Sequence, residues 1–174
     1  MPILPQIRDK RFITIRRGGT LTDDDHHLLA IWATECANHV LHLFEEIFPD
    51  DERPRQAIEA VQLWVNGEIK MMQARDFASA AQDAAREVKG ISEAARMAAL
   101  SAGQVAAVAH VAAHELGAVA YAIRAVMESV QKNEREIVRV RECQWQRDKL
   151  PEKIHELVLD NQRLRNEICW LVFE

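Results

Sequence analysis

The residues best suited to chemistry in this 174-residue sequence are four histidines that stand in two pairs. His110 and His114 are four residues apart, so on a helix both imidazoles lie on one face, where they could bind a metal ion. His39 and His42 are three residues apart and form a second pair. Because neither pair supplies enough ligands alone, a metal site would need all four histidines brought together by the fold.

We favour a structural role for these histidines, as hydrogen-bonding groups in an alanine-rich core, and we assign no metal or cofactor. A metal-dependent hydrolase built on the four imidazoles is the alternative. The sequence has no GxxxxGK[ST], GxGxxG or GxSxG motif, and its three cysteines stand in no nucleophile signature. We therefore predict no catalytic residue and a protein that is not an enzyme.

Acidic residues gather in sequence around the first two expected helices. The net charge is −5, and because residues 1–20 carry +4, the remainder carries −9. An acidic body favours a basic protein partner and argues against a nucleic-acid partner. The candidate partner-binding residues are Asp23, Asp24, Asp50, Asp51, Glu52 and Glu59.

Residues 1–20 are predicted to form a basic, extended arm or a small hairpin ahead of Gly18 and Gly19. Such an arm could contact phosphate through Arg16 and Arg17, which would make the protein a nucleic-acid accessory factor. Packing of the arm on the acidic body is the interpretation that we favour.

The remaining sequence is typical of an all-α protein, because 6 glycines and 5 prolines leave little material for turns. Thr22 with Asp25 forms a capping-box pattern, and Gly90 followed by Ser92 indicates a helix end and a new start. Residues 21–130 are predicted to form an alanine-rich helical core, arranged as a compact multi-helix bundle or a short α-solenoid. A helix break is expected between Gly103 and Gly117, with His114 as another possible position.

Residues 131–174 are predicted to form a charged helix and a last helix that begins at Pro151. Leucines recur every seven residues from Leu150, with apolar residues and one asparagine four residues after each, a pattern typical of a parallel two-stranded coiled coil. The helix either packs on its own bundle or joins two copies in a homodimer. The candidate self-association residues are Ile154, Leu157, Asn161, Leu164, Ile168 and Leu171.

Several motifs resemble the immunity-five-like family of bacterial immunity proteins over roughly residues 15–160. They comprise Leu28-x-Ala30-x-Trp32-Ala33-x-x-Cys36-Ala37, Val40-Leu41-x-x-Phe44-Glu45, Asp51-x-Arg53-Pro54-Arg55-x-Ala57-Ile58-x-Ala60, Trp64, Gly67, Ala109-His110-Val111-x-x-His114-x-x-Gly117-Ala118-x-x-Tyr121-Ala122, Trp145-Gln146 and Leu150-Pro151.

This resemblance implies a small α-helical protein of a bacterial toxin–antitoxin system that binds and neutralises a cognate protein toxin. It supplies no toxin-contact residues. The sequence also lacks a run of about 20 strongly apolar residues, so we expect no membrane association. Three widely spaced cysteines and no signal peptide predict free thiols and a cytoplasmic location.

Overall fold

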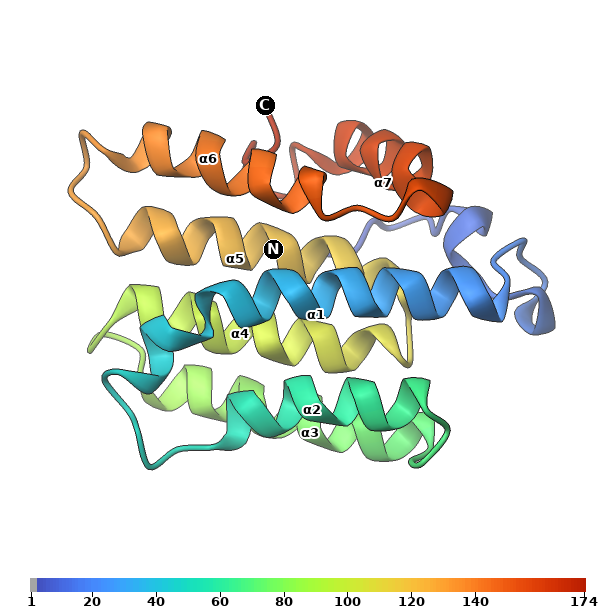
Figure 1. The fold of residues 1–174 in the computed structure, drawn as a ribbon, viewed down its shortest axis with the longest axis horizontal. Helices are drawn as coiled ribbons and strands as arrows, with labels where there is room; N and C mark the ends of the chain where they lie inside the picture. Colours follow the sequence, from blue (N-terminus) through green and yellow to red (C-terminus); the bar gives the residue numbers. More distant parts are fainter. Residues whose placement is uncertain (1–2) are drawn as a thin grey trace.

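The computed structural model describes residues 3–174, which fold into seven α-helices and three short 3-10 helices. In Figure 1 the helices stack in layers, with α6 and α7 above α5, α1 beside α4, and α2 beside α3 at the base. The all-α, compact helical class predicted from the sequence is thus confirmed. The α-helices are α1 (Asp23–Glu45), α2 (Arg53–Val65), α3 (Met71–Glu87), α4 (Glu93–Val108), α5 (Glu115–Glu128), α6 (Arg135–Asp148) and α7 (Glu152–Arg165).

Local sequence signals set the helix ends. The Thr22 hydroxyl accepts a hydrogen bond from the backbone N–H of Asp25 at 3.1 Å and donates one to its carboxylate at 2.8 Å, so the predicted capping box is formed. Ser92 caps α4 in the same way, accepting from the N–H of Ala95 at 3.2 Å. Gly90 between α3 and α4 has a φ of +82°, a left-handed conformation that favours glycine.

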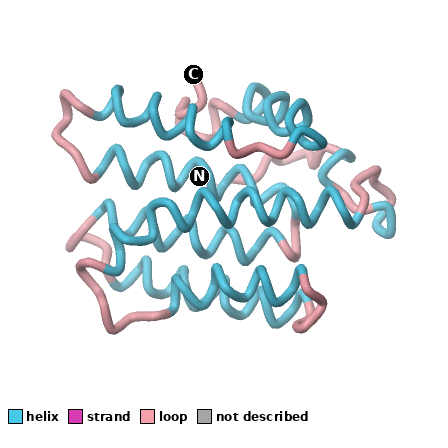
Figure 2. The backbone as a smooth tube through the Cα atoms, viewed as in Figure 1, coloured by secondary structure: helices cyan, strands magenta, loops and turns pink. Residues whose placement is uncertain are grey.

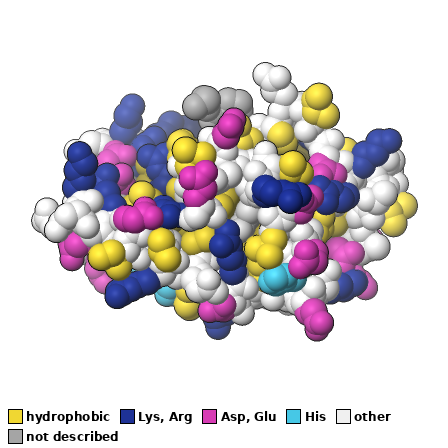
Figure 3. Space-filling view, turned by 90° about the horizontal axis from the view of Figure 1, so that it is seen from above, with side chains coloured by type: hydrophobic (Ala, Val, Ile, Leu, Met, Phe, Trp, Pro, Cys, Tyr) yellow, Lys and Arg dark blue, Asp and Glu magenta, His cyan; other side chains and the backbone are white. Residues whose placement is uncertain are grey.

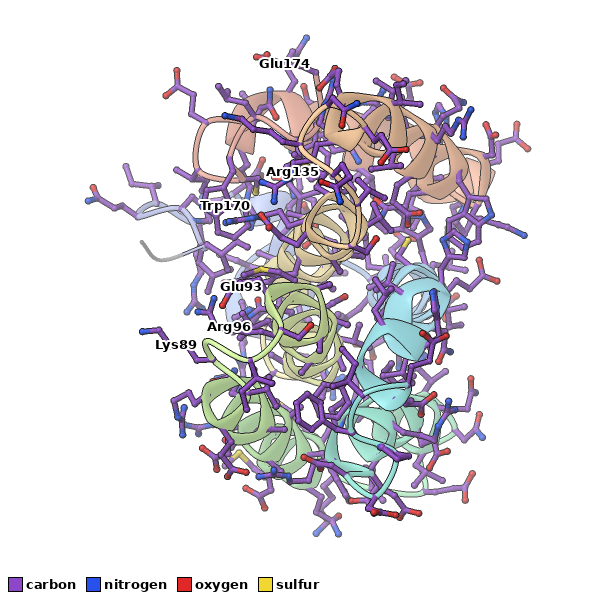
Figure 4. The ribbon with its side chains drawn as sticks, turned by 90° about the vertical axis from the view of Figure 1, so that its left-hand side faces the viewer. Lys89, Glu93, Arg96, Arg135, Trp170 and Glu174 are labelled. Atoms are coloured by element: carbon purple, nitrogen blue, oxygen red, sulfur yellow. The ribbon has the colours of Figure 1, made fainter. Side chains whose placement is uncertain are left out.

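Helix α4 is the centre of the molecule and packs against α1, α2, α3 and α5. In the end-on view of Figure 4, α1 and α2 stand on one side of the stack and α3, α4 and α5 on the other. Small side chains permit this close packing. At Gly103 an added Cβ would lie 3.2 Å from the backbone oxygen of Ala78 in α3, so the two backbones approach closely there. None of the described helices combines the length and the apolar character needed to cross a bilayer.

The expected break between the fourth and fifth helices falls at residues 109–114. Helix α4 ends at Val108, a 3-10 turn covers Ala112–His114, and α5 follows at once. Gly103 and Gly117, the two other possible break points, lie inside α4 and α5. His26 in the first turn of α1 fixes the break, because its Nε2 lies 2.7 Å from the backbone oxygen of Val108.

The prediction of one continuous C-terminal helix through Leu171 is wrong, because α7 ends at Arg165. The following residues fold back in turns, visible as the loop at the C-terminus in Figure 2. Trp170 and Leu171 adopt positive φ angles of 59° and 58°. The reversal is held by Asn166, whose side-chain oxygen accepts from the N–H of Phe173 at 3.0 Å, and it buries Phe173 in the core.

The N-terminal arm is less extended than expected. It contains 3-10 turns at Lys10–Phe12 and Ile15–Arg17, and an isolated bridge joins Thr14 to Leu21. Two of its arginines pair with acidic groups of the body: Arg11 with Asp160 of α7 at 2.7 Å, and Arg16 with Asp23 of α1 at 2.9 Å. These contacts favour packing of the arm on the body.

Candidate binding surface of helices α1 and α2

The four histidines considered as metal ligands do not converge. His39 is half-exposed and stacks on the indole of Trp145 with ring centroids 3.7 Å apart, while its Nδ1 lies 2.9 Å from a carboxylate oxygen of Glu142. His114 is directed elsewhere, with its Nδ1 2.7 Å from the side-chain oxygen of Gln104. Within residues 3–174 no group of three or more His, Cys, Asp or Glu side chains is arranged to hold a metal ion.

The length of α1 keeps the two pairs of histidines apart. His26, near the start of this helix, contacts the end of α4, so His110 lies at that end of the bundle. His39 lies 13 residues further along α1, which corresponds to about 20 Å of helix. A hydrolase centre that joins His39 and His42 to His110 and His114 is therefore a wrong hypothesis for this fold.

Burial sets the protonation of His114. Desolvation is the largest cause, with the nearby Arg165 second, and together they lower the pKa of His114 from 6.5 to about 4. The imidazole is therefore neutral at pH 7 and donates or accepts hydrogen bonds inside the core. His114 therefore has the hydrogen-bonding role that we favoured, whereas His39 and His42 are exposed and the Nδ1 atom of His110 has no hydrogen-bond partner.

The six acidic residues predicted to bind a partner form two groups rather than one. Asp23 and Asp24 begin α1, whereas Asp50, Asp51 and Glu52 follow its other end, and α1 spans about 34 Å. Asp23 forms an ion pair with Arg16 at 2.9 Å, and Asp51 forms one with Arg53 at 2.7 Å. Glu59 lies on the exposed side of α2 and groups with the second set.

Helices α1 and α2 lie together on the near side of the molecule in Figure 1, and a second grouping of exposed acidic residues follows these two helices and the connection between them, residues 46–52. We call it the acidic surface. Its carboxylates are exposed and form no ion pair with any described residue, while the two arginines beside it are neutralised, Arg53 by Asp51 at 2.7 Å and Arg55 by Glu45 at 2.6 Å. The acidic surface comprises Glu35, Glu46, Asp50, Glu52 and Glu59.

Apolar side chains are interspersed among these carboxylates. Ile31 and Leu63 are each 37% exposed and Ile47 is 49% exposed. Protein interfaces combine an apolar centre with a polar rim, and these three side chains are the apolar groups that the acidic surface offers. The upper face of α6 and α7 in Figure 3 differs in charge, because Lys and Arg side chains are intermixed there with Asp and Glu side chains.

Sequence reasoning missed Glu35 and Glu46. Glu35 lies on the exposed side of α1, four residues after Ile31, and Glu46 is the exposed residue that follows the end of this helix, four residues after His42. That spacing was available in the sequence, because the buried residues of α1 recur on the opposite face.

The heptad residues are split between core and surface. Ile154 and Asn161 are buried in their own chain, and Leu157 and Ile168 are partly buried. Leu164 is 63% exposed and Leu171 is 48% exposed, on either side of the point where α7 ends. Self-association through this segment stays a prediction, and these two leucines are the residues through which it would act.

The fold and its surface define a small, all-helical protein with exposed carboxylates along α1, α2 and the connection between them. The family model described as Imm-5 like putative immunity protein matches residues 19–153, more than half of the chain. The chain belongs to this family, which confirms the resemblance seen in its motifs. No curated protein and no solved structure gives a significant match.

Proposed function

We propose that this protein neutralises a cognate protein toxin by binding to it and covering its active surface, without catalysis. Membership of an immunity-protein family is the observation that carries this proposal. The acidic surface of α1, α2 and their connection supports it, because it offers carboxylates without an ion-pair partner and exposed apolar side chains.

Charge supplies speed and selectivity in such a mechanism. Carboxylates that are not neutralised by their own chain attract a basic partner and accelerate its encounter. A toxin with a basic active surface, such as a nuclease, fits this charge best. Ile31, Ile47 and Leu63 would supply the apolar contacts that hold the complex once it has formed.

We place this action in the cytoplasm of a bacterium. The three cysteines, Cys36, Cys143 and Cys169, are unpaired and buried, as expected for a reducing compartment.

The test is co-expression with the toxic product of a neighbouring gene. The native protein should restore growth, and a Glu35→Lys, Glu52→Lys, Glu59→Lys triple variant should lose protection while its thermal unfolding stays unchanged. Glu156→Lys is the matched control, because Glu156 is exposed on α7, away from the acidic surface.

A second variant, Asp23→Lys with Asp24→Lys, separates the two acidic groups. Loss of protection only in this variant would move the binding site to the start of α1. Full protection by both variants would refute the acidic residues as the binding surface.

A further inference from the structure

A cavity of about 590 Å³ lies beneath the N-terminal arm. Its walls come from four separate parts of the chain: the arm, the first turn of α1, the connection between α2 and α3, and the connection between α4 and α5. Its volume is in the range of small-molecule sites. The acidic surface contributes no residue to this cavity.

The cavity is lined by cations that have no acidic partner. Arg8, Arg17 and Lys70 line it, and none of them forms an ion pair with any residue in the described range 3–174. The single acidic residue of the lining, Asp23, is already paired with Arg16 at 2.9 Å. The cavity therefore holds excess positive charge within a chain whose net charge is −5.

Arg17 has few hydrogen-bond partners in the protein. Its guanidinium donates only to uncharged atoms, the backbone oxygen of His110 at 3.4 Å and the sulfur of Met71 at 3.7 Å. The 3.4 Å distance to the carbonyl oxygen is long for a guanidinium, which forms bonds of about 2.7–2.9 Å with carboxylates and phosphates, and a thioether sulfur is a weak acceptor. An anion in the cavity would give Arg17 the partner that it lacks.

His110 is a second unsatisfied group. Its Nδ1 atom is buried and has no hydrogen-bond partner. Burial is the largest cause that lowers the pKa of His110, and the positive charges of Arg75, Arg17 and Arg8 lower it further. A bound anion would offset the repulsion among these cations.

Apolar and aromatic side chains complete the walls. Phe12, Trp64 and Val111 line the cavity beside the cations, and the Trp64 ring lies 4.9 Å from the ring of His27. A ligand that matches both parts needs a compact anionic group joined to a less polar body. A phosphate ester matches them best, since its oxygens can accept from several cationic donors at once.

We propose that this cavity binds a small organic molecule through a phosphate group, with Arg8, Arg17 and Lys70 as phosphate ligands. A small ligand is favoured over a nucleic acid because the acidic body around the cavity repels an extended polyanion. Arg8 and Arg17 belong to the arm and Lys70 to the body, so the ligand would also bind the arm to the bundle.

The experiment is isothermal titration calorimetry of the full chain with inorganic phosphate, AMP, adenosine and sulfate. We expect AMP to bind in a saturable way, inorganic phosphate to bind more weakly and compete with it, and adenosine to give no signal. Arg17→Gln should weaken AMP binding about tenfold or more, because it removes a charge-assisted pair of hydrogen bonds. Arg141→Gln, an exposed arginine on α6, is the matched control and should leave affinity unchanged.

Lys70→Gln is a second variant that keeps the test decisive if Arg17→Gln fails to fold. The absence of AMP and phosphate binding at millimolar concentrations would overturn the proposal. So would sulfate binding as tightly as AMP, AMP affinity that both variants leave unchanged, or preference for single-stranded DNA or an acidic peptide. None of these outcomes bears on toxin neutralisation, which is tested by growth.

Discussion

The side-chain amide of Asn161 donates a hydrogen bond of 2.6 Å to the carboxylate of Glu115, joining α7 to the first residue of α5 in the core. Glu115 is fully buried and Asn161 is 4% exposed. Arg165 lies 3.8 Å from the other carboxylate oxygen and donates to the backbone oxygen of Ala113 at 2.8 Å. The asparagine that suggests a coiled-coil register thus has a partner within its own chain.

We expect Asn161→Ala to lower the free energy of unfolding by about 1–3 kcal/mol, because it leaves a buried carboxylate without its donor. Urea denaturation measures this effect. Asn66→Ala is the control, since Asn66 is exposed at the end of α2 and its loss should change stability by about 0.5 kcal/mol or less. Equal effects for both variants would show that the Asn161–Glu115 bond contributes nothing.

His114 makes stability depend on pH. Because its pKa falls from 6.5 to about 4 on folding, the unfolded chain takes up a proton more readily than the folded one. The contribution of His114 to stability is therefore complete above pH 6.5 and is lost as the pH falls through 4. Allowing for partial exposure, it amounts to about 2–3 kcal/mol.

His114→Asn tests this assignment, since the asparagine amide can still donate to Gln104 but does not titrate. We expect the loss of stability between pH 7 and pH 4 to be smaller in this variant by most of that amount, measured by urea unfolding at both pH values. His42→Asn, the same substitution at an exposed position, is the matched control. An unaltered acid dependence in His114→Asn would contradict the assignment.

The helices and most of their ends could be predicted from the sequence. Thr22, Ser92 and Gly90 act through neighbouring residues, and the hydrogen bonds that they predict are local. The end of α7 at Arg165 was not predictable in this way, because it depends on burial of Phe173. That burial requires the positions of α6 and α5, which no local pattern contains.

The same distinction applies to the candidate site. Asp24 begins α1 and Asp50 follows its end, so the length of this one helix already separates them by about 34 Å. Glu35 could have been predicted from the sequence, because its helical spacing places it on the exposed side of α1. The cavity beneath the arm was not, since Arg17 and Lys70 are brought together only when residues 1–20 fold back on the bundle.

Gly19 allows two segments of the arm to approach closely, because it has no side chain. An added Cβ would overlap the backbone carbonyl of Ile13, which accepts a hydrogen bond from the N–H of Leu21 at 3.0 Å. We expect Gly19→Ala to break this contact, to cost about 1–3 kcal/mol, and to accelerate hydrogen exchange at Leu21. Gly18→Ala is the matched control, because its Cβ would meet no atom within 4 Å and the cost is confined to a φ of +84°. Equal exchange rates at Leu21 in both variants would rule out a steric role for Gly19.

Ala98 tests the close packing of the bundle itself. It is fully buried in α4, in a cluster that includes Val40 and Phe44 of α1. Leucine adds three carbon atoms where the helices leave no room, so Ala98→Leu should lower stability by about 1–3 kcal/mol through forced rearrangement of the core. Ala94→Leu, on the same helix but partly exposed, should cost less because the larger side chain can extend toward solvent. If thermal unfolding showed Ala98→Leu to be as stable as the native protein, the axes of α1 and α4 would have to separate more easily than their small side chains indicate.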